Sequence, residues 1–237
     1  MPKRRGPFLR LVHFVFRLLA SWLLLTCAIV VALRWFDPPT TSFMLLDRIA
    51  ASNAGKQYTR RYRWIDAGAI SSQMKVAVIA AEDQHFPDHF GFDLDSINDA
   101  FDDMQSGRRV RGASTISQQV AKNLFLWPGQ HWIRKGLEAY FTVLIEVFWP
   151  KQRILEVYLN VAEFGAGVFG VGAASEMFFG KSPAQLNAYD AALLAAVLPS
   201  PKRMRVNAPS AYVRSRQQWI MSQMRGLGGP ALLERLD

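Results

Sequence analysis

Residues 76–86 read VAVIAAEDQHF. An uninterrupted apolar run from Val76 to Ala81 is followed at once by two carboxylates, Glu82 and Asp83. From about Ile70 onward the apolar residues recur three and four positions apart, as in a helix with one face in a core. The stretch therefore predicts a buried helix with acidic groups at its end, within a mainly helical fold.

Burial disfavours the charged form of a carboxylate, so the pKa of Glu82 is expected to rise toward values useful for proton transfer. If the helix continues to Phe86, that residue, His85 and His89 share a face with Glu82, although Pro87 would end or bend such a helix. Glu82 is thus a candidate general base or acid. The plain alternative is that the acidic pair occupies a solvated helix end, and composition alone favours it.

His85 and His89 lie four residues apart and Asp93 follows, which raises the question of a zinc site. The pattern is not H-E-x-x-H, and Pro87 disrupts the helical spacing. No metal ligand is assigned on this evidence. The chain has a single cysteine, Cys27, which excludes a disulfide framework and a cysteine zinc site.

Further helices are predicted downstream, whereas strand-like alternation is nearly absent. Their expected ranges are Ile97–Met104, Thr115–Leu126, Ile133–Phe148, Lys151–Val161, a helix between Gly172 and Gly180, Tyr189–Val197 and Tyr212–Arg225. Thr115 and Gln118 fit a capping box at the start of the second. Residues 43–64 read as a basic linker.

Residues 112–123, GASTISQQVAKN, place Thr115, Gln119 and Lys122 on one helix face. Uncharged polar groups with one cation suit a surface that binds sugar and phosphate oxygens, where a lysine acts as a point charge. The alternative is a capped surface helix. The neighbouring run from Leu124 to Trp127 suggests either contact with a bilayer or burial in the core.

Residues 134–138 read RKGLE, so Glu138 follows Arg134 by four residues and Lys135 by three. Ordinary salt bridging within a helix explains this pattern and contributes about 0.3–0.5 kcal/mol per pair. The functional interpretation is a second carboxylate, flanked by cations, at a site that handles a phosphate leaving group.

The N-terminus carries Lys3, Arg4, Arg5 and Arg10 before a long apolar segment, Leu11 to Leu33. A bilayer span needs about 20 residues. We expect an uncleaved transmembrane helix rather than a signal peptide, with its N-terminus in the cytoplasm by the positive-inside rule. The net charge of +9 indicates an anionic partner, but no nucleic-acid-binding motif is present, so nucleic acid is not expected.

Five stretches in this order resemble the motifs of the glycosyltransferase family 51 domain, the peptidoglycan glycosyltransferase of bacterial cell-wall synthesis. They are EDQHFPDHFGFD (82–93), GASTISQQVAKNLF (112–125), RKGLE (134–138), ILEVYLNVAEFG with GVGAASEMFFGK (154–181) and AALLAAVLPSPKRM (191–204). The resemblance covers roughly residues 66–220. Ala113 stands where the family commonly has glycine. The Ser72-x-x-Lys75 and Ser96-x-Asn98 matches to a penicillin-binding module lack K-T-G, so a monofunctional enzyme of cell-wall biogenesis and cell shape is expected.

The resemblance implies a lysozyme-like, mainly α-helical domain behind an N-terminal transmembrane helix. The expected organisation is a basic cytoplasmic tail (1–10), the membrane helix (11–33), a linker (34–65), the glycosyltransferase domain (66–225) and a C-terminal tail (226–237). The expected location is the bacterial inner membrane, single-pass, with the catalytic domain in the periplasm.

The resemblance also implies a reaction in which lipid II is polymerised into β-1,4 glycan with inversion and release of undecaprenyl pyrophosphate. Glu82 would be the general base and Glu138 the second acidic residue. The implied substrate-binding residues are Asp83, Phe86, His89, Ser114, Thr115, Gln119, Lys122, Asn123, Arg134 and Lys135.

The implied partners are lipid II, the growing glycan chain and the bilayer, with other cell-wall synthesis proteins as candidates. A divalent ion, Mg²⁺ or Mn²⁺, could assist electrostatically, although no dedicated set of ligands can be read from the sequence. Two alternatives stay open: a lytic muramidase, which would also need one protonated glutamate, and a catalytically silent scaffold. The cations Lys122, Arg134 and Lys135 argue against a muramidase, because glycan cleavage releases no pyrophosphate.

Overall fold

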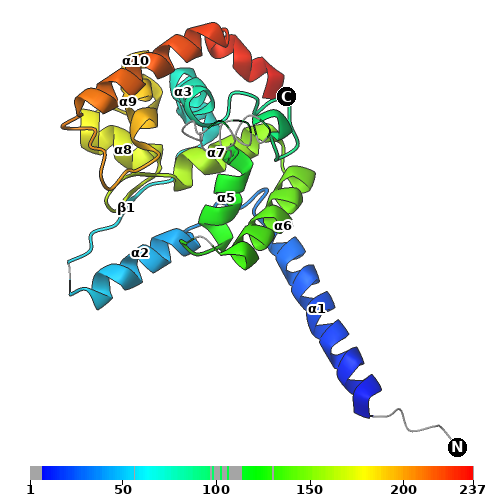
Figure 1. Ribbon diagram of the computed structural model, residues 1–237. Helices are drawn as coiled ribbons and strands as arrows, with labels where there is room; N and C mark the ends of the chain where they lie inside the picture. The colour runs from blue at the N-terminus through cyan, green and yellow to red at the C-terminus, as the bar shows by residue number, and fades with distance from the viewer. Residues whose placement is uncertain are drawn as a thin grey trace, which may run out of the picture. The chain divides into compact units, whose positions relative to one another are not determined.

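The computed structural model describes residues 7–55, 57–96, 98, 102, 106, 114–129 and 131–236 (Figure 1). The chain divides between Asp37 and Pro38 into two compact units. The first is dominated by helix α1 (Pro7–Ala32). Its part from Phe8 to Ala32 is long and apolar enough to cross a membrane, since 25 residues of helix span about 37 Å against a hydrocarbon core of about 30 Å.

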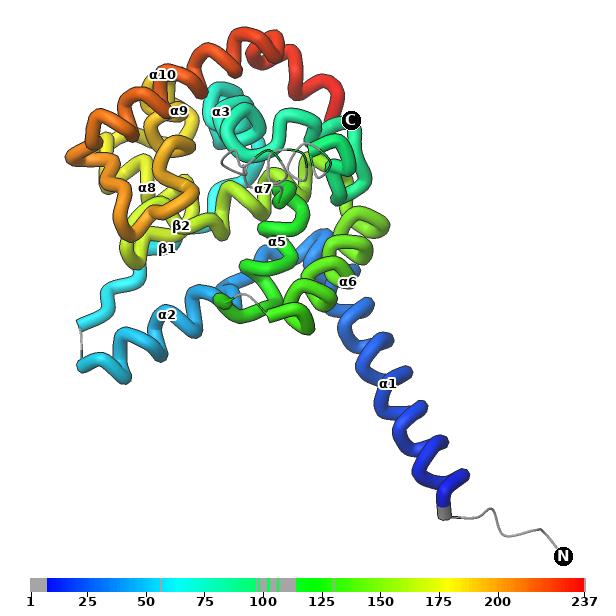
Figure 2. Tube along the Cα trace, in the orientation of Figure 1, coloured from blue at the N-terminus to red at the C-terminus, as the bar shows by residue number. Residues whose placement is uncertain are grey.

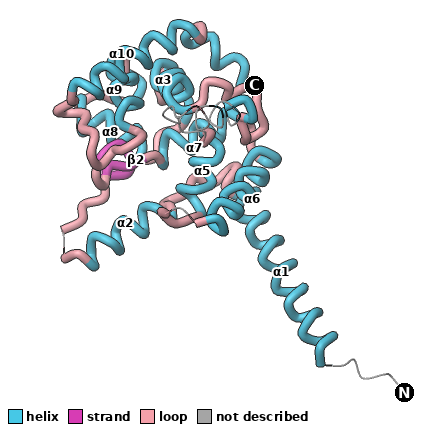
Figure 3. Tube along the Cα trace, viewed as in Figure 1, coloured by secondary structure: helices cyan, strands magenta, loops and turns pink. Residues whose placement is uncertain are grey.

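The second unit is mainly helical, as predicted (Figure 3). Its α-helices among the described residues are α2 (Ser42–Asn53), α3 (Ser72–Glu82), α5 (Ile116–Phe125), α6 (Trp132–Phe148), α7 (Lys151–Val161), α8 (Gly170–Phe179), α9 (Ala188–Val197) and α10 (Ala211–Gly226). Short 3₁₀ segments are η1 (Ala67–Ala69), η2 (Pro183–Gln185) and η3 (Gly229–Leu236). Every predicted helix from Thr115 onward is confirmed to within about two residues at each end.

Two groups of helices form this unit, and α7 links them (Figure 2). In one group α3 packs against α9, α10 and η3, while in the other α5 packs against α6 and α2. Helix α7 contacts α5 and α6 on one side and α8 on the other. The side chains from Val76 to Ala80 are fully buried, because the apolar run of α3 is enclosed on several sides.

A small three-stranded sheet adjoins α8. The strand order is β1 (Arg61–Tyr62), β3 (Val168–Phe169), β2 (Glu163–Gly165), with β1 parallel and β2 antiparallel to β3. Gly170 begins α8 directly after β3 with φ +78°, and a Cβ there would lie 2.5 Å from the carbonyl oxygen of Asn160. This position therefore requires glycine.

Helix α3 ends at Glu82 rather than continuing to Phe86, so the face that a longer helix would have shared among Glu82, His85, Phe86 and His89 does not form. Asp83 leaves the helical conformation at φ −162° and ψ 81°, and residues 84–88 form turns. Pro87 explains part of this change, since proline disfavours helical backbone in the residue before it. The acidic pair thus lies at the true end of the helix.

The capping box predicted for α5 is confirmed. Thr115 Oγ1 accepts a hydrogen bond from the Gln118 N–H at 3.2 Å, and Gln118 Oε1 accepts one from the Thr115 N–H at 3.0 Å. These bonds satisfy N–H groups that a helix start leaves without partners. They fix where α5 begins, and hence the direction in which its later side chains point.

Two segments carry more structure than the sequence suggested. The presumed linker over residues 43–64 contains α2, whose Ser42 hydroxyl donates to the Asn123 carbonyl at 3.3 Å and so joins it to α5. The presumed tail contains η3, which packs against α3 and buries Leu232 and Leu236. The helix predicted for Ile97–Met104 lies mostly outside the described residues.

Candidate functional site

The Glu82 carboxylate lies at the C-terminal end of α3 and contacts both α5 and α10. Gln119 Nε2 donates a hydrogen bond to Glu82 Oε2 at 2.9 Å, and Arg216 Nη2 lies 3.5 Å from Glu82 Oε1. Only 13% of the Glu82 side chain is exposed. Burial raises the pKa of Glu82, and Gln119, Arg216 and Lys122 oppose the rise without cancelling it. The direction expected from the sequence is confirmed, and it suits a group that accepts a proton.

Asp83 joins the turn that follows α3 to the start of α5. Its Oδ2 accepts a hydrogen bond from the Ile116 N–H at 2.9 Å, and its Oδ1 lies 2.9 Å from His89 Nε2. His89 Nδ1 accepts from the Gly91 N–H at 3.1 Å, so Nε2 is the nitrogen that donates to Asp83. The side chains of Asp83 and His89 are both more than nine-tenths buried, so they support the site from within the protein.

Phe86 is fully buried and has no surface that a substrate could touch. The Nζ atom of Lys151 lies 4.6 Å from its ring centroid and also donates to the His89 carbonyl at 2.7 Å and to Glu146 at 2.9 Å. This cation–π contact holds the turn from the side opposite α5. Phe86 can therefore shape the acceptor side only through packing, not by direct contact.

Helix α5 presents Gln119 and Lys122 on the face predicted from their spacing. Burial lowers the pKa of Lys122, and the charges of Arg134 and Lys135 lower it further. The carboxylates of Glu138 and Glu82 act in the opposite direction. Lys122 is thus electrostatically coupled to carboxylates from two different helices. Its Nζ also lies 5.6 Å from the ring centroid of Phe43.

The other predicted residues of this segment differ in exposure. Thr115 is buried, and besides capping α5 it donates a hydrogen bond to the Gly91 carbonyl at 2.7 Å, so its hydroxyl is used within the protein. Ser114 is exposed and Asn123 is half-buried. These two remain accessible to a ligand, whereas Thr115 does not.

Helix α6 carries a buried ion-pair cluster in its first turns. Arg134 Nη1 donates to Glu138 Oε2 at 2.6 Å, Arg134 Nε donates to the Gly129 carbonyl at 2.7 Å, and Lys135 pairs with the other carboxylate oxygen. Arg134 and Glu138 are buried, while half of the Lys135 side chain is exposed. The salt-bridge interpretation is therefore confirmed, and Glu138 aligns two cations on the side of the site near Lys122.

Three residues of this neighbourhood were not predicted. Arg216 reaches Glu82 from α10, and the hydroxyl of the buried Tyr158 donates to Gln119 Oε1 at 3.3 Å. Phe43 approaches Lys122 from α2. A tyrosine on the buried face of α7, between apolar Val157 and Leu159, was a weak available signal for Tyr158. Nothing in the local sequence distinguishes Arg216 from the other arginines of α10.

The two histidines considered for zinc serve different partners. His85 Nδ1 lies 3.0 Å from Asp93 Oδ2, whereas His89 pairs with Asp83. Within the described ranges, no group of three or more His, Cys, Asp or Glu side chains is arranged to hold a metal ion. The divalent cation considered from the sequence thus has no site built from these side chains.

The run from Leu124 to Trp127 is mostly part of the core. Leu124 and Leu126 are buried, and the Phe125 ring stacks on Phe141 with centroids 4.4 Å apart. Trp127 alone in the run is largely exposed, at 40%. Core packing therefore accounts for the run, apart from this one tryptophan.

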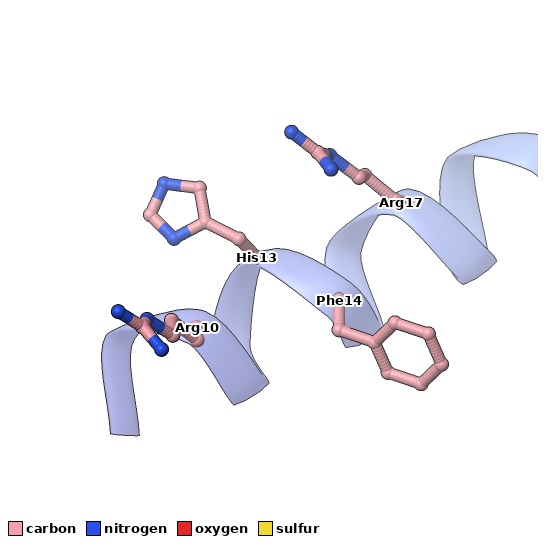
Figure 4. A pocket seen from close by; sticks show the side chains of 4 residues that line it. All are labelled: Arg10, His13, Phe14 and Arg17. Atoms are coloured by element: carbon pink, nitrogen blue, oxygen red, sulfur yellow. The ribbon is translucent and has the colours of Figure 1, made fainter. Parts of the chain in front are cut away.

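A pocket on α1 is lined by Arg10, His13, Phe14 and Arg17 (Figure 4). In this view the Arg10, His13 and Arg17 side chains extend to one side of the helix and the Phe14 ring to the other, and the lining contains no carboxylate. The pocket lies within the apolar helix that is long enough to cross a membrane, and it lacks the buried carboxylate that the site around Glu82 provides. We therefore assign the candidate active site to α3, α5 and α6.

Comparison with known sequences agrees with this assignment. The model of a family described as Transglycosylase matches residues 49–225. A biosynthetic peptidoglycan transglycosylase of Xanthomonas oryzae pv. oryzae is 52% identical over 236 residues, which cover 98% of this chain and 94% of the relative. Proteins of the same name from Pseudomonas entomophila (52% identical, 89% of each chain) and Stutzerimonas stutzeri (50% identical, 92% of this chain and 90% of the relative) are similarly close.

Proposed function

Because this chain belongs to the transglycosylase family and is a peptidoglycan glycosyltransferase of cell-wall synthesis, we propose that Glu82 is the general base with which it polymerises lipid II. The observation that carries this proposal is the position of Glu82. Its carboxylate is largely buried and has a raised pKa, and it interacts electrostatically with the cation Lys122. A proton acceptor next to a cation suits the transfer of a sugar from a pyrophosphate.

In the proposed reaction, Glu82 takes the proton of the 4-hydroxyl of an incoming lipid II. The oxygen then attacks the anomeric carbon of the growing chain, and the bond from that carbon to the pyrophosphate oxygen breaks. The bond that breaks is α and the bond that forms is β, so the transfer inverts. The leaving group departs as an anion, which needs cations more than it needs a proton.

Lys122, Arg134 and Lys135 are the proposed cations for the pyrophosphate. Glu138 acts in this scheme by holding Arg134 and Lys135, since both of its oxygens are paired with them. Gln119 orients Glu82, while Ser114 and Asn123 are available for sugar or phosphate oxygens. Asp83, His89, Phe86 and Thr115 support these residues from below.

We further propose that α1 anchors the enzyme in the inner membrane as a single span. The cations Arg10 and Arg17 and the basic residues before them would lie at the cytoplasmic headgroups, with the catalytic unit in the periplasm. Lipid II and the growing glycan both carry polyprenyl chains, so an anchored enzyme meets its substrates at the same surface.

The test incubates the detergent-purified full chain with labelled lipid II and, in parallel, with preformed glycan. Wild type should form polymer from lipid II, and Glu82→Gln should form none. Glu176→Gln, an exposed glutamate of α8 paired with Arg63, is the matched control and should polymerise normally. Polymer formation by Glu82→Gln would refute the role of the base. Shortening of preformed glycan would instead indicate a lytic enzyme, and folded protein without either activity would indicate a scaffold.

A further inference from the structure

Arg216 contacts the candidate base from a helix that lies outside all five motifs. Its Nη2 atom lies 3.5 Å from Glu82 Oε1 and donates to the Ala81 carbonyl at 3.3 Å. The same guanidinium therefore touches both the carboxylate and the end of the helix that carries it. Figure 1 shows α10 running beside α3, the arrangement that makes this contact possible.

Several features of the fold oppose ionisation of Glu82. The side chain is largely buried, Asp83 follows it directly, and it lies at the C-terminal end of α3, where the helix dipole is negative. Burial is the largest cause that raises the pKa of Glu82, and Asp83 adds to it, so these surroundings favour the protonated carboxyl, which cannot take a proton from a hydroxyl. The site therefore needs a cation that stays beside Glu82.

The groups that face Glu82 leave two candidates for this cation. The groups that face Glu82 are Gln119 and Lys122 from α5, Tyr158 from α7, Arg216 from α10, and the adjacent Asp83. The two cations among these groups are Lys122 and Arg216. Lys122 is also coupled to Glu138, Arg134 and Lys135, on the side proposed for pyrophosphate. Its charge is engaged once that anion binds, whereas Arg216 remains directed at α3.

We propose that Arg216 is a positioning residue that keeps the Glu82 carboxylate ionised and oriented, which leaves Lys122 to the substrate. This inference rests on the proposed function of Glu82. Arg216 Nε is buried and has no hydrogen-bond partner in the described part of the chain, so the guanidinium meets the end of α3 through Nη2, at the Glu82 carboxylate and the Ala81 carbonyl.

The structural alternative is that Arg216 merely staples α10 to α3. A second contact, between α10 and the turn that follows α3, provides the control, since Gln84 Nε2 donates to Gln223 Oε1 at 3.3 Å. Gln223→Leu removes that contact without touching the carboxylate. Arg214 provides a charge control, because it lies on α10 but binds the Tyr189 hydroxyl at 2.8 Å.

The experiment measures the initial rate of polymer formation from labelled lipid II as a function of pH for full-length Arg216→Gln, Arg216→Lys, Gln223→Leu and Arg214→Gln. We expect Arg216→Gln to move the acid limb of the profile upward by about one pH unit, with roughly tenfold lower activity below the limb and recovery above it. Arg216→Lys keeps the charge and should retain most of the wild-type profile. The Gln223 and Arg214 variants should keep the wild-type limb.

An acid limb that stays in place in Arg216→Gln, or moves equally in Gln223→Leu, would overturn the inference. Thermal unfolding followed by circular dichroism shows which variants are folded. If Arg216→Gln is not folded, the acid limb of Arg216→Lys is compared with the acid limb of Gln223→Leu instead. Glu82→Gln separates the two proposals. If Glu82→Gln is inactive at every pH and the acid limb does not move in Arg216→Gln, only the proposed role of Arg216 is wrong. If Glu82→Gln polymerises lipid II, the proposed base itself is wrong.

Discussion

Gln119 Nε2 donates a hydrogen bond of 2.9 Å to Glu82 Oε2, while Gln119 Oε1 accepts one of 3.3 Å from the Tyr158 hydroxyl. The two bonds use both ends of one amide, so α7 sets the orientation in which α5 presents its donor to α3. The Glu82 carboxylate is therefore held by a short chain of side chains rather than by one neighbour.

Replacing Gln119 by methionine should slow polymerisation of lipid II by about tenfold or more, because a hydrogen bond to a charged group contributes about 1.5–3 kcal/mol. Tyr158→Phe removes only the bond that orients Gln119 and should cost less. Initial rates at saturating lipid II give the comparison. A larger loss in Tyr158→Phe than in Gln119→Met would show that Glu82 does not depend on this amide.

Lys122→Met should reduce turnover by about a hundredfold, because a half-buried cation proposed to face the pyrophosphate is lost. Lys181→Met is the control, since Lys181 pairs with Asp190 away from the site, and it should leave turnover nearly unchanged. The measurement is kcat/KM with labelled lipid II. Equal losses in both variants would argue against a specific role of Lys122.

Glu138→Gln should destabilise the fold by about 3–5 kcal/mol, because it leaves the buried Arg134 charge without its partner. The double variant Arg134→Met, Glu138→Leu removes both charges and should recover most of this loss in urea-induced unfolding. It should nevertheless remain poor at polymerisation, since a cation proposed for the pyrophosphate is gone. Recovery of activity together with stability would restrict this cluster to a structural role.

Gly91→Ala should be strongly destabilising. The backbone has φ +81°, and a Cβ would lie 2.7 Å from Thr142 Cγ2 and 2.9 Å from Glu146 Cγ. Positive φ alone costs a non-glycine residue about 1–2 kcal/mol, and overpacking adds about 1–3 kcal/mol. Gly180→Ala is the matched control, with φ +62° and open space around it. Similar melting temperatures for both variants would show that the contact at Gly91 relaxes easily.

The fold should become less stable as pH rises from about 4.5 to about 6 because of Glu163. Burial is the largest cause of the rise of its pKa from 4.5 to about 6, against the opposing effects of Lys202 and the Gly167 N–H. The folded state thus binds a proton more tightly than the unfolded chain, and the free energy of unfolding falls as that proton is lost.

Glu163→Gln removes this titration, so thermal unfolding should depend less on pH between about 4.5 and about 6, and the variant should melt higher than wild type at neutral pH. Glu176→Gln, at a largely exposed side chain, should keep the wild-type dependence. A wild-type dependence in Glu163→Gln would assign the titration to another group.

Local patterns predicted those features that local interactions create. The apolar run before Glu82 gave α3, the Thr115 and Gln118 spacing gave the capping box, and Arg134 and Glu138 lie on one helix at the spacing that pairs them. Each of these depends on residues a few positions apart, where helix geometry alone determines the contact.

Contacts between distant segments could not be obtained in this way. Arg216 meets Glu82 only because α10 packs on α3, and Ser42 reaches α5 only because α2 folds back as a helix rather than a linker. Phe86 was expected beside the substrate because the resemblance to the family's first motif implied that role. In the structure α3 ends at Glu82, and within the turns of residues 84–88 the Phe86 ring is the buried side chain.

Asp83 gives one oxygen to His89 and the other to the first amide of α5. Asp83 therefore ties the turn after α3 to the start of α5, the helix that carries Lys122, so neither segment moves without the other. Because a single carboxylate joins the two, the placement of the proposed base relative to Lys122 is set when the chain folds.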